Sequence, residues 1–128
     1  MHQPPTIISA RWIVPIEPAG VVLEDHALVI QDGLILAILP HATALRNHPA
    51  ATPIDRPAHV LMPGLVNAHT HAAMTLFRGL ADDLPLETWL NGHIWPAESR
   101  WVTPDFVRDG AELALLEMLL GGTATCGD

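Results

Sequence analysis

The chain of 128 residues carries a formal net charge of −8, and 49% of its residues are hydrophobic. This composition suffices for a folded core and argues against long disorder, while 14 acidic against 6 basic residues argue against nucleic-acid binding. The single cysteine, Cys126, excludes an internal disulfide and fits a reducing compartment. With no signal-peptide pattern and no apolar run near the roughly 18 residues of a membrane span, we expect a cytoplasmic protein that does not enter membranes.

Residues 1–60 predict a small, mostly β unit. A strand at 6–16 follows from its β-branched residues, and Asp32-Gly33 between two apolar runs is typical of a tight hairpin turn. The expected elements are the strand 6–16, the hairpin strands 26–30 and 34–39, a short helix at 40–47, a proline-rich connector at 50–58 and a short strand at 59–62.

Residues 61–128 predict alternating strands and helices. A strand is expected at 65–71, and a helix at 86–94 that Pro96 closes. The next helix opens at Thr103-Pro104-Asp105, is apolar nearly all round and therefore well buried, and stops at Gly121-Gly122 before a second strand. This order is typical of a parallel sheet. Because a (β/α)₈ barrel needs about 250 residues, we expect the N-terminal part of a longer barrel protein.

The strand expected at 65–71 carries two histidines near its end. Alternation of side chains along a strand would put Leu65, Asn67, His69 and His71 on one face. Two imidazoles placed in this way can hold a metal ion. The alternative is a pair of exposed histidines with no specific role. Asn67 would either fix a histidine ring by a hydrogen bond or pack as a polar group in the barrel floor.

The stretch PGLVNAHTH, residues 63–71, resembles the opening metal motif of the amidohydrolase superfamily. The continuation MTLFRGLADDL, residues 74–84, with Trp89-Leu90 and Pro96-Ala97-Glu98, resembles the 5′-methylthioadenosine/S-adenosylhomocysteine deaminases, in the branch that also holds the triazine chlorohydrolases. The resemblance implies an α/β fold. A β-sandwich portion (1–60) would be followed by the first strand-helix units of a TIM (β/α)₈ barrel (61–128).

The same resemblance implies the roles of four residues. His69 and His71 would be two ligands of one zinc ion, with iron as an alternative metal. Glu98 would accept hydrogen bonds from substrate ribose hydroxyls, although an acid at a helix end can equally be a solvated one. Trp89 would line the substrate pocket, or else pack as a core aromatic.

The resemblance further implies the reaction. Water activated by zinc would deaminate an adenosine-type nucleoside, a small-molecule substrate, to the inosine analogue with release of ammonia. No catalytic residue is expected within this chain, because the third histidine ligand, the proton-shuttling glutamate, a further histidine and the metal-binding aspartate would belong to later strands. The chain alone should be inactive. Whether the protein forms a homo-oligomer stays open.

Three alternatives remain. The first is a sister enzyme, such as a guanine or cytosine deaminase or a triazine hydrolase. The second is a non-catalytic binding protein on a degenerate barrel. The third is a complete 128-residue protein that self-associates, which the exposed strand edges of an unclosed sheet argue against. The remaining histidines match no motif and are expected to lie on the surface or to pack: His2, His26, His41, His48, His59 and His93.

Overall fold

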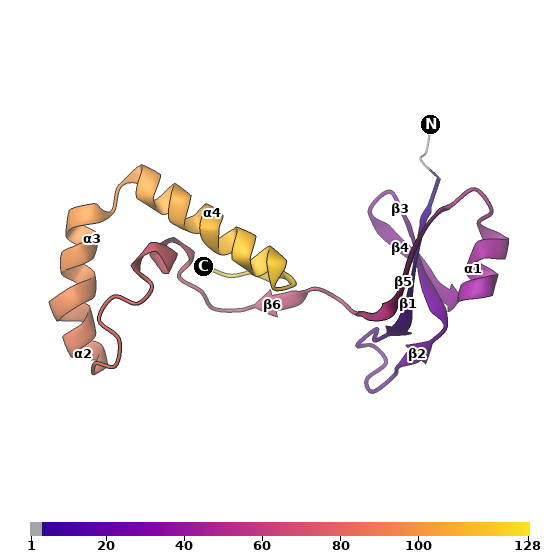
Figure 1. The fold of residues 1–128 in the computed structure, drawn as a ribbon, viewed down its shortest axis with the longest axis horizontal. Coiled ribbons are helices and arrows are strands. Elements are labelled where there is room, and N and C mark those ends of the chain that lie inside the picture. Colours follow the sequence, from indigo (N-terminus) through magenta and orange to yellow (C-terminus); the bar gives the residue numbers. More distant parts are fainter. Residues whose placement is uncertain (1–3) are drawn as a thin grey trace. The chain divides into compact units, whose positions relative to one another are not determined.

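The computed structural model describes residues 4–128, and these divide into two compact units between Pro63 and Gly64 (Figure 1). His2, expected at the surface or in packing, lies outside the described residues. Within residues 4–128, no helix has the length and apolar character needed to cross a membrane.

The first unit is built on one five-stranded sheet with a short helix. Its central strand β1 pairs in parallel with β5 and antiparallel with β2 and β3, and β4 extends the sheet beyond β3. The predicted hairpin is confirmed: Asp32 and Gly33 have φ of 51° and 78°, the left-handed geometry of a two-residue hairpin turn. The elements are β1 (Thr6–Ile13), β2 (Leu23–Glu24), β3 (His26–Gln31), β4 (Leu34–Pro40), α1 (His41–Asn47) and β5 (Thr52–Leu61).

Strand β5 corrects one prediction. Residues 50–58 were expected to be a connector, but Thr52–Leu61 is a continuous strand that pairs in parallel with β1, with one shift of register between Ala10 and Trp12. Prolines disfavour a central strand because they lack the N–H donor of the ladder. β5 tolerates Pro53 and Pro57 because it pairs only with β1, so an absent donor can face away from the sheet.

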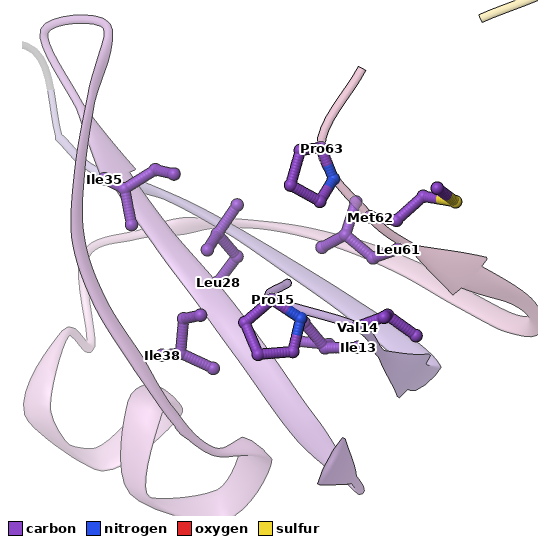
Figure 2. Close-up of a pocket in the computed structure, with 9 residues that line it drawn as sticks. All are labelled: Ile13, Val14, Pro15, Leu28, Ile35, Ile38, Leu61, Met62 and Pro63. Atoms are coloured by element: carbon purple, nitrogen blue, oxygen red, sulfur yellow. The ribbon is translucent and has the colours of Figure 1, made fainter. Parts of the chain in front are cut away.

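The two faces of this sheet differ in how they are covered. One face packs on α1, where Ala44 meets the buried side chains of Ile7, Ala27 and Val29. The residues that alternate with these point to the other face, which carries an apolar hollow of about 180 Å³. Figure 2 shows side chains from β1, β3, β4 and β5 lining this hollow, among them Leu28 and Leu61.

The second unit contains the predicted strand–helix–strand order. Strands β6 and β7 pair in parallel and are joined by helices, which confirms the predicted parallel strand–helix–strand arrangement. The elements are β6 (Leu65–Asn67), the 3₁₀ helix η1 (Ala72–Phe77), α2 (Leu86–Trp89), the π-helical turn η2 (Leu90–Ile94), α3 (Trp95–Trp101), α4 (Pro104–Leu120) and β7 (Thr123–Cys126).

The prediction that Pro96 closes a helix is wrong. Helical backbone runs on through η2 and α3 to Trp101, and Pro96 occupies the first turn of α3. A π-helical turn already interrupts the regular hydrogen-bond ladder there, so the missing proline N–H is tolerated.

Helix α4 begins and ends where predicted, but its burial does not match the prediction. The Thr103 hydroxyl accepts a hydrogen bond from the Phe106 N–H at 3.1 Å, as a helix N-cap does. However, the only α4 residues that are buried within residues 4–128 are Gly110 and Ala114. One stripe of the helix meets η1 and β7, and apolar side chains elsewhere on it are exposed, up to 90% for Leu120.

Candidate metal centre

The two motif histidines lie beyond the carboxyl end of β6. The prediction of one strand over 65–71 is wrong, because β6 ends at Asn67. There the Asn67 side-chain Oδ1 accepts a hydrogen bond from the His69 backbone N–H at 3.2 Å, a local turn that competes with the extended strand. The Asn67 side chain therefore holds the backbone, where the sequence predicted a bond to a ring nitrogen or a packing role.

The rings of His69 and His71 nevertheless meet in space. Their centroids are 5.0 Å apart with the planes perpendicular, and both residues are exposed. Two imidazoles that share one tetrahedral zinc, each with a Zn–N distance of about 2.0–2.1 Å, have ring centroids about 5 Å apart. The separation fits two ligands of one metal ion, and neutral imidazole nitrogens suit zinc or iron.

Residues 4–128 supply no complete metal site. Nowhere among them do three or more His, Cys, Asp or Glu side chains gather closely enough to hold an ion. The histidine pair therefore amounts to two ligands, and a zinc site needs at least three from protein.

The segment that follows His71 contacts two other parts of the unit, the residue beyond β7 and helix α4. At its start, the Ala72 N–H donates to the Asp128 carboxylate, just beyond β7, at 2.8 Å. Along its length, helix α4 crosses so close that a β-carbon on Gly110 would stand 2.3 Å from the Ala73 carbonyl oxygen. Both contacts restrict the backbone immediately after the second histidine.

The far end of η1 is tied to α4 by an ion pair. The Arg78 guanidinium donates two hydrogen bonds to the Glu117 carboxylate, at 3.0 and 2.6 Å. Hydrogen bonding to Arg78 lowers the pKa of the Glu117 carboxyl, and the same contact raises the pKa of Arg78. Arg78 thus ties the end of η1 to α4, and the pair remains largely open to solvent.

A cavity of about 340 Å³ lies beside the metal-binding candidates. His71, Thr75, Leu80, Asp82 and Trp89 are among its lining residues. The Trp89 indole N–H donates to the Leu80 carbonyl at 3.1 Å, which fixes the orientation of the ring. Trp89 and His71 therefore border one hollow, although they are far apart in sequence.

Glu98 lies on α3 and is half-buried. It does not line the cavity that His71 and Trp89 share. The structure therefore brings together His69, His71 and Trp89, and it leaves Glu98 outside this group.

Comparison with known proteins identifies the fold unit that carries these residues. Residues 60–128 match the amidohydrolase family. The chain belongs to this family. β6, β7 and the helices between them correspond to the beginning of the TIM barrel of amidohydrolase structures.

Individual relatives are also similar. A 5-methylthioadenosine/S-adenosylhomocysteine deaminase of Saccharophagus degradans is 55% identical over 95% of this chain and 27% of its own length. An adenosine deaminase structure from Xanthomonas campestris with bound zinc has 55% identity and a TM-score of 0.92, over 96% of this chain and 28% of that one. A mutant atrazine chlorohydrolase of Arthrobacter aurescens, with zinc and atraton, has 26% identity and a TM-score of 0.85, with coverages of 96% and 28%. The chain thus spans about a quarter of the length of the relatives it matches.

Asp128 lies next to the candidate metal ligands, and no sequence motif pointed to it. It follows β7 as part of Gly127-Asp128, at the carboxyl end of a parallel strand. Functional side chains of a (β/α)₈ barrel occupy this end of the strands. Its position after a predicted strand could have pointed to Asp128. Its hydrogen-bond partner Ala72, however, is 56 residues away in sequence, and no local pattern predicts that contact.

Proposed function

We propose that this amidohydrolase chain forms part of a zinc-dependent deaminase of adenosine-type nucleosides. The substrate would be 5′-methylthioadenosine or S-adenosylhomocysteine, which would yield the inosine analogue and ammonia. The observation that carries the proposal is the 5.0 Å separation of the His69 and His71 rings, next to a cavity that His71 shares with Trp89. The 55% identity to the Saccharophagus deaminase supports this substrate class.

His69 and His71 would hold the metal ion through ring nitrogens. Zinc is the proposed metal, since it is bound in the similar Xanthomonas structure, and iron is the alternative. When bound, the ion would supply Lewis-acid activation of water at neutral pH. The remaining ligands would come from residues outside 4–128, because no three His, Cys, Asp or Glu side chains gather to hold an ion among the described residues. The group that moves the proton would come from the same later strands.

Two further residues would bind the nucleoside. Trp89 offers a rigid aromatic face to the cavity, and its N–H is already satisfied by Leu80, so the ring is free to stack on a purine. Glu98 would accept from the two vicinal ribose hydroxyls, because one ionised carboxylate can bind two donors at once. Neither role requires a charge change during the reaction.

The decisive experiment measures metal content and turnover together in the full-length protein that carries this sequence. We expect one zinc per subunit, hydrolysis of 5′-methylthioadenosine and S-adenosylhomocysteine, and loss of both metal and activity when His69 and His71 are replaced by alanine. A protein that purifies without stoichiometric metal, and that the double replacement leaves unaltered, would instead be a non-catalytic binding protein.

Hydrolysis of triazines is the second candidate function, favoured by the likeness to the atrazine chlorohydrolase. The Glu98→Gln variant separates the two, because a ribose-binding carboxylate matters only for nucleosides. We expect this variant to raise KM for nucleosides, with Glu87→Gln on α2 as the matched control. Turnover of triazines or guanine at least equal to that of nucleosides, with no effect of Glu98→Gln, would refute the nucleoside assignment.

A further inference from the structure

The backbone N–H of Ala72 is the first donor after the second motif histidine. Ala72 begins η1, and the first N–H groups of a helix have no partner within the helix. Ala72 is 5% exposed, so solvent access to this donor is restricted. Its partner is the Asp128 carboxylate, whose Oδ1 accepts the hydrogen bond at 2.8 Å.

Asp128 reaches this donor from just beyond the end of a paired strand, β7. β7 pairs with β6 up to Asn67↔Cys126, and the Gly127 N–H donates to the Asn67 carbonyl at 2.9 Å. Next to the same ladder, a β-carbon on Gly64 would stand 2.4 Å from the Ala124 β-carbon, so the two strands approach as closely as a glycine permits. The parallel pair therefore holds the backbone up to Gly127, the residue before Asp128.

The backbone of His71 depends on this contact. His71 is the residue that enters η1, with φ of −129° and ψ of 71°, and no side chain within η1 caps the turn. The first N–H of η1, that of Ala72, is therefore bound by a residue outside η1, Asp128, which follows β7. An anchored following peptide restricts the Cα–Cβ direction of His71, which sets the positions that its ring can reach.

We propose that Asp128 is a positioning residue for His71. Its carboxylate Oδ1 accepts from the Ala72 N–H and so fixes the backbone that aims the His71 ring at the metal ion. The inference rests on the proposed function, since it assigns Asp128 to the same metal site. Asp128 acts through the hydrogen bond, so an uncharged acceptor of the same shape should serve in its place.

The test compares Asp128→Ala with Asp128→Asn in the full-length protein. Asparagine keeps an Oδ1 acceptor and loses the charge, whereas alanine loses both. We expect Asp128→Ala to weaken zinc binding on the order of 10- to 100-fold in chelator competition, as loss of groups that orient metal ligands does. Asp128→Asn should restore most of that affinity. In the metal-free protein, the Ala72 amide should exchange with solvent faster in Asp128→Ala than in Asp128→Asn.

Thr103→Ala is the matched control. It also removes a side-chain acceptor from a backbone N–H at a helix start, that of Phe106 on α4. We expect it to lower the unfolding midpoint without changing zinc affinity or the visible spectrum of the cobalt-substituted protein, which Asp128→Ala should alter.

The outcomes separate the two proposals. A wild-type protein that binds no zinc refutes the proposed function, and the role of Asp128 falls with it. A wild type that binds zinc, with Asp128→Ala of equal affinity, refutes the role of Asp128 alone. Equal loss in the alanine and asparagine variants also refutes it, because the charge and not the hydrogen bond would then matter.

Discussion

The backbone of Gly110 on α4 lies against the carbonyl of Ala73 on η1, with no room for a side chain between them. A β-carbon at position 110 would stand 2.3 Å from the Ala73 oxygen and 3.1 Å from its carbonyl carbon. Because Ala73 is the second residue after His71, the packing of a long helix is coupled directly to the segment that carries the candidate metal ligand.

Gly110→Ala should therefore destabilise the protein. The added methyl group meets backbone, which cannot move aside as a flexible side chain can, and overpacking of this kind costs about 1–3 kcal/mol. Chemical denaturation measures the effect. Gly92→Ala is the control, because a β-carbon there meets nothing within 4 Å and alanine favours helix. Equal stability of the two variants would contradict the close approach of α4 to η1.

The second prediction concerns the crossing of Gly64 and Ala124. Gly64→Ala should lower stability, also by about 1–3 kcal/mol, because its β-carbon would stand 2.4 Å from that of Ala124. The double variant Gly64→Ala with Ala124→Gly removes the clash and should recover much of the loss. A double-mutant cycle in thermal unfolding measures the coupling, and additive effects would show that the two positions do not touch.

Replacement of either motif histidine should abolish metal binding. His69→Ala or His71→Ala removes a ligand outright, so the loss of zinc affinity should exceed the roughly 10–100-fold typical of groups that only orient ligands. Metal analysis after dialysis and competition with a chelator measure it. His93→Ala is the control, since His93 is exposed on η2, away from the motif. Retained zinc in both ligand variants would contradict the assignment.

The Arg78–Glu117 pair should make a small, acid-sensitive contribution to stability. The pair holds the pKa of Glu117 below its ordinary value of 4.5, so the charged form is favoured in the folded state. The contribution is therefore complete above pH 4.5 and is lost as the pH falls through the lowered pKa. Because both side chains are exposed, added salt should weaken it further.

Melting temperatures of wild type and Glu117→Gln, followed from neutral to acid pH, test this pH dependence. We expect the difference between them to shrink as the pH falls below 4.5. Glu112→Gln, on the same helix and also exposed, controls for the change of net charge. A melting-temperature difference between wild type and Glu117→Gln that grows toward acid pH would contradict the expected pH dependence.

The isolated 128-residue chain should bind hydrophobic dyes and self-associate. Leu116, Leu119 and Leu120 on α4 are 59%, 67% and 90% exposed within this chain, and contiguous apolar surface of this kind promotes association. Sedimentation velocity and dye fluorescence measure both properties. Replacement of these three leucines by glutamate should reduce them, whereas replacement of exposed Arg46 and Arg56 by glutamate should have little effect. A monomeric isolated chain that melts cooperatively and binds no dye would contradict the prediction.

Structural features that depend on interactions between residues close in sequence were predictable from the sequence. The hairpin followed from Asp32-Gly33, because its backbone needs positive φ, and the start of α4 followed from Thr103, whose hydroxyl satisfies a free N–H. The histidine pair was also recognisable, because it forms part of a short motif. In each case the deciding interaction spans only a few positions.

Interactions between distant residues were decided by the tertiary structure alone. Residues 52–61 became strand β5 because β1 offered a free edge, despite two prolines that locally favour a connector. The histidine rings met across a turn beyond β6, where the sequence pattern predicted one strand face. Asp128 met Ala72 only because β6 and β7 pair in parallel. The sequence by itself determined which side chains can bind a metal ion, whereas the pairing of strands, a property of the whole chain, decided what holds them in place.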